Sequence, residues 1–263
     1  MKRLSFWLVM CFLMFWGSSL QAQIGREEGI SLFVQGNLAY KEGDYKGAIG
    51  KYEEILRGGI ESGAVYFNLA NSYYRDGNVG KAIVNYERAR QLIPRDSDLN
   101  FNYHYARSRA QNDIKEKPPS FILEQWMNQH AAFFSLEEMV LMITLIVLSM
   151  AGIYLGALYW RQDKRLYRPV LIALGIVLAV FIAGLSKRQR LQANQAIVIY
   201  ETVANFEPRA NSTVHFKLSP GTKVTVIKQE EGWTKVKRLD GNLGWVPQGV
   251  MEEIETDTKN LTS

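Results

Sequence analysis

The chain has 263 residues, with 31 Lys and Arg against 26 Asp and Glu, which gives a formal net charge of +5 at pH 7. This length suits two ordinary domains, but the apolar residues are concentrated in blocks, which argues against one globular core. The excess positive charge lies beside apolar segments and therefore indicates membrane flanks, not a nucleic-acid surface. The single cysteine, Cys11, lies in the first apolar block, which excludes a disulfide framework and leaves no thiol elsewhere.

Residues 1–22 are typical of a secretory signal peptide. Lys2 and Arg3 precede the apolar run SFWLVMCFLMFW, and the polar, small-residue stretch GSSLQA follows it. Cleavage is expected after Ala22, and the alternative is an uncleaved membrane anchor. Both interpretations place the segment that follows outside the cytoplasm.

Two further apolar blocks predict a pair of transmembrane helices, over 136–160 and 169–186. Residues 139–160 contain no charged side chain, and at about 1.5 Å rise per residue they span a hydrocarbon core of about 30 Å. Ser135 and Glu138 have the spacing of a capping box, which predicts a helix start at 136. The second helix is shorter and needs the long cationic side chains at its ends to extend toward the interface.

The expected loop between these helices, residues 161–168, carries four cations: Arg161, Lys164, Arg165 and Arg168. The positive-inside rule therefore predicts a cytoplasmic loop, with the segments on either side of the hairpin outside. A membrane-surface linker is expected over 114–135 and a second linker over 187–195. These features together predict a multi-pass protein of the bacterial inner membrane, whose large segments face the periplasm.

Small residues recur within both predicted spans. Gly152 and Gly156 form a GxxxG pair, and Gly175, Ala179 and Ala183 have the same spacing in the second span. Such rows allow close packing of membrane helices, which is the hypothesis for this pair. The alternative is that small residues are simply common in membrane helices.

An internal repeat precedes the membrane segments. Residues 32–56 match residues 66–90 at an offset of 34, with Gly, Ala, Ile and Tyr positions in register, and Pro94 ends the second copy. This period and pattern resemble the tetratricopeptide repeat (TPR). The resemblance implies an all-α TPR domain over 29–113, with repeats at 29–62 and 63–96 and a capping helix at 97–113.

In tetratricopeptide domains the first helix of each unit lines a concave groove. The residues that this chain places there are Phe33, Asn37, Tyr40, Lys41, Phe67, Asn68, Asn71, Tyr74, Arg75, Asn102, Tyr105 and Arg109. Asn and Arg among aromatic residues suit an extended peptide, whose amides and carboxylates need polar partners. The alternative is an ordinary solvated helix face. Asn37 and Asn68 also match the carboxylate clamp of some tetratricopeptide domains, but Phe33, Asp98 and Asn102 replace its other members, so no clamp is predicted.

Residues 196–255 change to a period of two, and turn signals such as Pro220-Gly221 and Asp240-Gly241 separate the short runs. Five or six strands in a small all-β barrel are expected, followed by a disordered tail over 256–263. The stretch 219–247 resembles the bacterial SH3-like family. That resemblance makes Trp233 and Trp245 candidate contacts for cell-wall peptides or proteins, and the alternative is that both rings pack in the core.

The predicted fold class is thus a multidomain membrane protein that joins a helical repeat domain, a two-helix hairpin and an SH3-like barrel. This order, after a signal peptide, resembles the BatE family, component E of the Bacteroides aerotolerance system. The resemblance implies partners with von Willebrand A domains, other Bat components and a MoxR-type ATPase.

No catalytic motif accompanies these modules. His104, His130 and His215 lie in different segments, and the chain has no HExxH, P-loop or GxSxG motif. We therefore expect no catalytic residue, no bound metal and no cofactor. Two functions remain open: a membrane-anchored adaptor that binds proteins, and a cell-wall sensor whose SH3-like module binds peptidoglycan.

Overall fold

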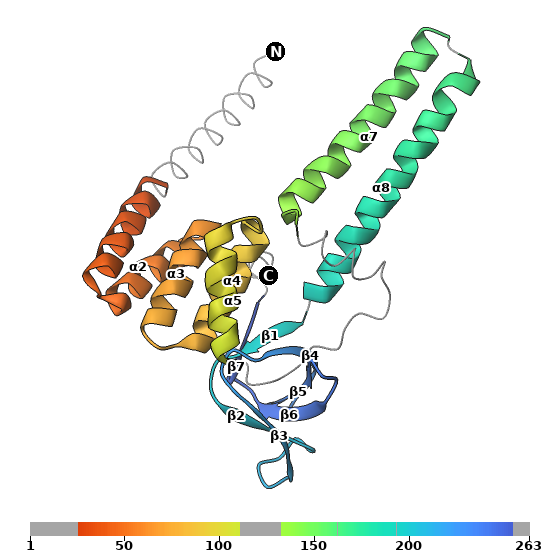
Figure 1. Ribbon diagram of the computed structural model, residues 1–263. Helices are drawn as coiled ribbons and strands as arrows, with labels where there is room; N and C mark the ends of the chain where they lie inside the picture. Colours follow the sequence, from red (N-terminus) through yellow and green to blue (C-terminus); the bar gives the residue numbers. More distant parts are fainter. Residues whose placement is uncertain (1–25, 111–132, 162, 193, 255–263) are drawn as a thin grey trace, which may run out of the picture.

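The computed structural model describes residues 26–110, 133–161, 163–192 and 194–254. Figure 1 shows a stack of helices, a long two-helix hairpin and a small bent β-sheet, so the predicted fold class is confirmed. The predicted signal peptide (1–22), the tail (256–263) and most of the linker 114–135 lie outside the described residues.

The stack of helices, called here the repeat domain, contains five helices in the described range 26–110. The first covers 26–42, and the others are α2 (Tyr45–Arg57), α3 (Gly63–Arg75), α4 (Val79–Leu92) and α5 (Ser97–Ala110). α2 packs on α3, α3 on α4, and α4 on α5. The repeat domain thus consists of two helix pairs followed by a single helix, and residues 111–113 of the predicted cap lie outside the described residues.

The turn inside each repeat has the same construction. Gly43 and Gly77 have φ values of 84° and 88°, a left-handed conformation that glycine adopts without steric cost. Asp44 and Asn78 then cap the second helix, because each side chain accepts a hydrogen bond from the backbone N–H three residues on. The same turn and cap construction therefore recurs in both repeats at an offset of 34.

Small residues let the paired helices of each repeat approach. Ala48 and Ala82 are fully buried, one in each repeat. A Cβ atom at Gly36 would lie 2.7 Å from the ring of Tyr52, so only glycine fits beside that buried tyrosine. The core of the domain is thus made of large tyrosines packed against small residues.

The hairpin consists of α7 (Leu136–Tyr159) and α8 (Lys164–Gln192). Segments of 24 and 23 residues in them contain 18-residue stretches with mean hydropathies of 2.3 and 2.6, and are long and apolar enough to cross a membrane. The capping box at Ser135 is confirmed, since its hydroxyl accepts from the N–H of Glu138 and its own N–H donates to that carboxylate.

α8 is longer at both ends than the sequence predicted. Asp163 accepts a bond from the N–H of Arg165 and so starts the helix at Lys164, inside the predicted loop 161–168. The helix also continues through most of the predicted linker 187–195, and strand β1 begins at Gln195. α8 therefore ends at Gln192, only a few residues before the first strand of the β-sheet.

The two hairpin helices pack on each other, but not through the predicted small residues. A Cβ atom at Gly152 or Gly175 would meet nothing within 4 Å. Ala179 and Ala183 are exposed, and Gly156 faces the ring of Trp160 in its own helix. The predicted small-residue contact between α7 and α8 is therefore wrong for this hairpin.

Larger side chains form the contact instead. Among the less exposed positions, one set recurs at alternating spacings of four and three: Met139, Ile143, Ile146, Met150, Ile153 and Ala157 in α7, and Tyr167, Leu171, Leu174, Leu178, Phe181 and Leu185 in α8. This spacing of 3.5 residues is the seam of an antiparallel coiled coil, in which large knobs fill opposite holes. Met142, Gly156, Gly175 and Gly184 are also half-buried, and a Cβ atom at Gly184 would meet the side chain of Met139 at 3.6 Å.

The C-terminal part, called here the β-domain (residues 194–254), is one antiparallel sheet in the order β3-β2-β6-β5-β4-β1-β7. Its strands are β1 (Gln195–Val198), β2 (Thr202–Asn205), β3 (Val214–Leu218), β4 (Lys223–Glu230), β5 (Trp233–Arg238), β6 (Leu243–Pro247) and β7 (Met251–Glu253). Seven strands replace the expected five or six. Inward-facing Val, Ala and Leu side chains form a small core of their own.

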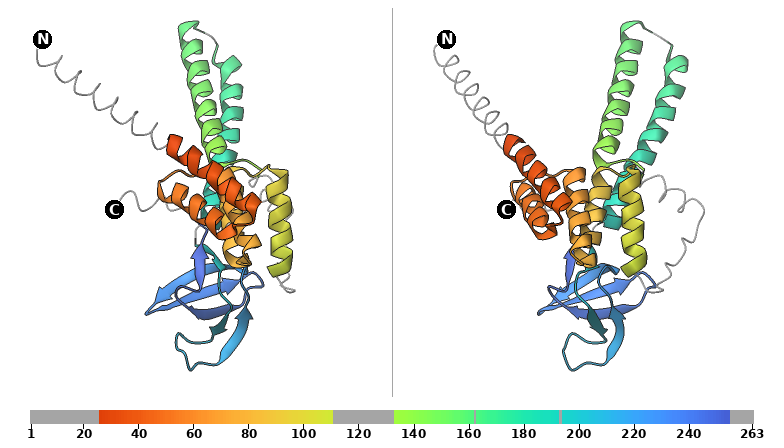
Figure 2. Two further views of the ribbon diagram at one scale, coloured as in Figure 1. Left: turned by 90° about the vertical axis from the view of Figure 1, so that its left-hand side faces the viewer. Right: turned by 60° about the vertical axis from the view of Figure 1, so that its left-hand side comes forward.

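The β-domain packs directly against the repeat domain. In both views of Figure 2 it lies beside the repeat helices, on the side away from the turn of the hairpin. α4 contacts β1 and β7, and the buried side chains of Ile197 and Ile254 belong to the core of the repeat domain. The core of the repeat domain therefore extends into the β-domain through these two side chains, which the sequence did not predict.

Candidate functional site

The twelve residues predicted to bind a partner lie on helix 26–42, α3 and α5, which are the first helices of the three units. We call the surface that these helices share the A-face. None of the twelve side chains is buried; each is half-buried or exposed. The fold thus brings the predicted residues to one side of the repeat domain, where a partner can reach them.

Two asparagine pairs join neighbouring helices of the A-face. The Nδ2 of Asn68 donates to Oδ1 of Asn37 over 2.9 Å, and the Nδ2 of Asn102 donates to Oδ1 of Asn71 over 3.0 Å. The second pair repeats the first at an offset of 34. Within the described part of the chain, Nδ2 of Asn37 and Asn71 and Oδ1 of Asn68 and Asn102 have no hydrogen-bond partner. Each pair thus offers one donor and one acceptor, the complement of a peptide group.

Buried tyrosines fix the orientation of these asparagines. The hydroxyl of Tyr52 donates to Oδ1 of Asn37 over 2.7 Å, and that of Tyr86 donates to Oδ1 of Asn71 over 2.6 Å. Burial raises the pKa of Tyr52 to about 12 and also raises the pKa of Tyr86, so both hydroxyls keep their protons at neutral pH. With each Oδ1 held in this way, the free amide N–H groups of the asparagines have a fixed direction.

Aromatic rings line the A-face between the polar groups. Phe33 lies 5.9 Å from Tyr52, and its repeat equivalent Phe67 lies 6.2 Å from Tyr86, measured between ring centroids. These phenylalanines pack partly against the core and leave one side accessible. The same residues therefore pack against the core on one side and form an apolar floor for a partner on the other.

Three cations follow one rim of the A-face: Lys41, Arg75 and Arg109, which are separated from one another by 34 residues along the chain. We call them the cation row. The guanidinium of Arg75 donates to the hydroxyl of Tyr45 over 2.7 Å, and that of Arg109 donates to the hydroxyl of Tyr105 over 3.1 Å. No described carboxylate forms an ion pair with any of the three. The row is thus partly ordered yet still carries its charge.

The cation row ends at a pocket of about 560 Å³ between the two domains, called here the junction pocket. The turn 76–79 and the end of α5 (109–110) form one wall, and residues 199–200 and 219–220 of the β-domain form the other. Sequence reasoning missed this pocket, because nothing in the repeat pattern placed the β-domain beside α5.

Close backbone approach holds the domains together. A Cβ atom at Gly80 would lie 2.7 Å from Cα of Ile199, and one at Gly221 would lie 2.6 Å from Cβ of Ala110. Lys46 occupies the position of Gly80 in the first repeat. The replacement of a lysine by a glycine at this repeat position was the one sign in the sequence that another part of the chain packs closely on α4.

A buried carboxylate also links the domains. Glu87 on α4 accepts from the hydroxyl of Tyr103 over 2.7 Å and from Nζ of Lys223 in the β-domain over 3.0 Å, and Arg90 lies 3.7 Å away. Burial would raise the pKa of Glu87, but these cations and the tyrosine hydroxyl outweigh burial and hold the pKa below its ordinary value. The carboxylate is therefore charged at neutral pH.

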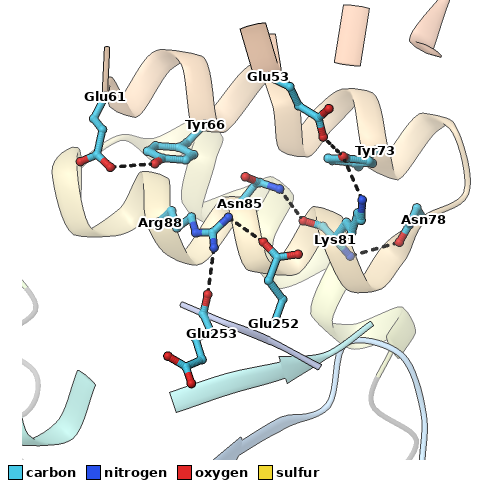
Figure 3. A network of polar contacts seen from close by, with 10 residues as sticks. All are labelled: Glu53, Glu61, Tyr66, Tyr73, Asn78, Lys81, Asn85, Arg88, Glu252 and Glu253. Carbon is cyan, nitrogen blue, oxygen red and sulfur yellow. Dashed lines mark hydrogen bonds and ion pairs between the residues drawn. The ribbon is translucent and has the colours of Figure 1, made fainter. Parts of the chain in front are cut away.

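A second polar network crosses the outer side of the domain interface. Figure 3 shows Arg88 of α4 reaching the β7 strand, where its NH1 lies 2.8 Å from Glu252. Above it, the hydroxyl of Tyr73 donates to Glu53 and accepts from Nζ of Lys81 over 3.4 Å. Most polar groups of this network already pair with one another, so it stabilises the interface rather than presenting free partners.

The β-domain presents a different aromatic surface from the predicted one. Trp245 is only 8% exposed and Trp233 is half-buried, so the core-packing alternative describes Trp245. Phe206 is 57% exposed and stacks on His215 at 4.2 Å. Nothing in the sequence singles out this pair, because an isolated Phe and His carry no motif.

The remaining histidines and acidic residues do not converge. His104 is an exposed residue of α5, and His130 lies outside the described residues. In the part of the chain that the structure describes, no three His, Cys, Asp or Glu side chains are placed to hold a metal ion.

Comparison with known families identifies both modules. Residues 63–96 match the tetratricopeptide repeat, and residues 206–252 match the bacterial SH3 domain. The first match has the bounds predicted for the second repeat, and the second lies within the β-domain. No curated protein matches the chain. Both kinds of module are typically non-catalytic interaction modules, which supports a role in binding proteins or the cell wall.

Proposed function

We propose that this protein is a non-enzymatic, membrane-anchored adaptor that binds extended segments of partner proteins on its A-face. The two asparagine pairs carry the proposal. Each offers the donor and acceptor that a peptide group needs, and the repeat period places the second pair one unit along the same face. The aromatic floor between them suits the side chains of an extended chain.

The proposed location is the bacterial inner membrane, with the repeat domain and β-domain in the periplasm. The two apolar helices and the cations at their turn favour this orientation. The geometry adds support, because α7 starts beside the repeat domain and α8 runs into the β-domain, so both modules lie at the same end of the hairpin. The turn is then the cytoplasmic segment.

The proposed partners are envelope proteins of the Bat and MoxR type, including proteins with von Willebrand A domains. The order of signal segment, repeats, hairpin and SH3-like module supports this assignment, since it resembles the BatE family throughout. The role in that complex is the assembly of partners and not catalysis, and aerotolerance is its proposed physiological output.

Substitution of Asn68 and Asn102 by alanine tests the adaptor function. This double variant removes the free acceptors but keeps the tyrosine bonds to Asn37 and Asn71, so the fold is preserved. We expect recovery of specific membrane partners after detergent solubilisation and affinity purification to fall at least about fivefold, which corresponds to about 1 kcal/mol. The measurement is quantitative mass spectrometry of the purified complexes.

The matched control is Gln35→Ala, an exposed amide on the first helix that lies away from the asparagine pairs. Its partner recovery should equal that of the natural chain. Equal recovery with the double variant as well would count against the A-face as the binding surface.

A second candidate function is binding of peptidoglycan by the β-domain. The exposed Phe206–His215 stack within the bacterial SH3 match favours it, because flat rings bind sugar and peptide surfaces. The full chain in detergent should then sediment with purified sacculi, and Phe206→Ala should reduce the bound fraction. A supernatant that retains all of the protein would reject this candidate.

A further inference from the structure

We infer that the β-domain completes the peptide site: an acidic partner runs along the cation row, pairs a carboxylate with Arg109, and inserts an apolar side chain into the junction pocket. This inference rests on the proposed binding of a peptide at the A-face. It adds the chemical class of the partner and a second domain to that site.

The cation row is the first observation. Its three side chains occupy the same repeat position, so they project along one rim at intervals of one unit. Glu42 and Asp76 directly follow Lys41 and Arg75, but consecutive residues of a helix do not face each other, and no described ion pair joins them. The row is therefore available to carboxylates of a partner.

Tyrosine hydroxyls order two members of the row. Arg75 lies over the ring of Tyr45 at 5.2 Å, and Arg109 lies over the ring of Tyr105 at 5.5 Å, in addition to their hydrogen bonds. These contacts occupy one side of each guanidinium and reduce the rotamer freedom that binding would otherwise remove. The remaining N–H groups can then donate to an incoming carboxylate.

The junction pocket supplies the second observation. Arg109 stands at its edge, and the apolar side chains of Val79, Ala110, Ile199 and Pro220 line it. One carboxylate, Asp76, also lines it, so the pocket itself is not an anion cage. A carboxylate at the rim beside Arg109 and an apolar group within the pocket fit this arrangement better than a buried anion.

The pocket is preformed because its walls cannot separate freely. Gly80 and Gly221 bring the two domains into backbone contact, and the bond from Lys223 to the buried Glu87 fixes their relative position. A binding surface that is rigid before the partner arrives loses less entropy on binding. The second domain is therefore part of the binding surface.

Two labelled peptide pools test the charge preference. Both contain dodecapeptides of mixed Ala, Ser and Leu; one has Glu at every fourth position and the other has Gln there. We expect the full chain in detergent to bind the Glu pool at least about tenfold more tightly by fluorescence anisotropy, and this preference to shrink as salt is raised.

Substitutions locate the preference on the structure. Arg109→Gln should weaken binding of the Glu pool about fivefold and leave the Gln pool unchanged, and Lys41→Gln with Arg75→Gln should act in the same direction. Tyr200→Ala, in the β-domain wall of the junction pocket, should weaken both pools. Lys46→Gln, an exposed lysine on α2, is the charge-matched control and should weaken neither.

Equal binding of the two pools, or an Arg109→Gln variant that keeps the preference for Glu, would overturn the inference. If Asn68→Ala with Asn102→Ala still weakened both pools in that case, the proposed function would stand without its acidic partner. An unchanged affinity in Tyr200→Ala would remove the β-domain from the site. Binding of neither pool would also overturn the inference, and the co-purification result would then decide the proposed function alone.

Discussion

Equivalent positions of the two repeats show how one residue type can acquire two roles. Glu53 and Glu87 are 34 residues apart and both accept a bond from a tyrosine hydroxyl. Glu53 remains half-buried at the outer surface, whereas the β-domain covers Glu87 and supplies Lys223 as its counter-ion. The same side chain is thus a surface acceptor in one repeat and a buried link between domains in the other.

Glu87→Gln should destabilise the protein by about 2 kcal/mol at neutral pH, because the neutral amide leaves the ammonium of Lys223 without its counter-ion at the interface. Denaturant unfolding of the full chain in detergent, monitored by tryptophan fluorescence, measures this change in the free energy of unfolding. Glu54→Gln is the control, since Glu54 is an exposed residue paired only with Lys51, and it should change stability by less than about 0.5 kcal/mol.

The same substitution should also alter the pH dependence of stability. The folded-state pKa of Glu87 lies below its ordinary value of 4.5, so its contribution is complete above pH 4.5 and is lost as pH falls through the folded-state pKa. The difference between the natural chain and Glu87→Gln should therefore shrink in acid. A difference that stayed constant down to pH 3 would contradict the assigned charge.

At the scale of the elements, α4 decides how the molecule is assembled. One side of this helix packs on α3 and α5, and another side packs on β1 and β7. Its residues 82–87 are all buried, a run that an amphipathic surface helix does not show. The helix therefore serves as the shared wall of both domains.

Gly80→Ala tests this docking. The added methyl group would approach the backbone of Ile199 at 2.7 Å, so the domains must separate, and we expect a loss of about 1 to 3 kcal/mol in unfolding free energy. Gly50→Ala is the matched control: Gly50 also lies within a helix, but its Cβ would meet nothing within 4 Å. That variant should be stabilised by about 0.5 to 1 kcal/mol through helix propensity.

Hydrogen exchange separates docking from folding in these variants. Gly80→Ala should increase exchange in β1, β7 and α4 while the centre of the sheet remains protected. Unchanged protection in β1 and β7, together with unchanged stability, would contradict the close approach at this glycine.

At the scale of the whole molecule, the hairpin is attached to both soluble parts at its open end. Arg95, in the turn after α4, pairs with Glu138 at the start of α7 and lies over the ring of Phe133. At the other helix, α8 leads into β1 across residues 193–194. Because the repeat domain and β-domain also contact each other, the hairpin, the repeat domain and the β-domain are each connected to the other two.

This arrangement makes a prediction about topology. Alkaline phosphatase, which is active only outside the cytoplasm, should be inactive when fused after Asp163 in the turn and active when fused after Ser263. A cytoplasmic fluorescent reporter at the same two positions is the control and should give the opposite pattern. The reverse result would place both recognition domains in the cytoplasm and reject the proposed location.

The sequence by itself determined most features that depend on local chemistry or on a period, although the start of α8 behind Asp163 was missed. The offset of 34 predicted the helix pairs and the twelve residues of the A-face, and the apolar blocks predicted the hairpin with its capping box at Ser135. Glycine turns, caps and periodicity act between residues close in the chain, so they can be read without knowledge of the fold.

Only the tertiary structure decided which surfaces meet. The small residues at Gly152 and Gly175 suggested a helix contact, yet large residues at a 3.5-residue spacing form it, because packing depends on the facing helix as well as on composition. Likewise, the junction pocket joins the repeat domain to the β-domain, and the Glu87–Lys223 bond joins residues 136 positions apart, on either side of the hairpin in the sequence. Such contacts arise from the complementarity of two folded surfaces, which no period within either one encodes.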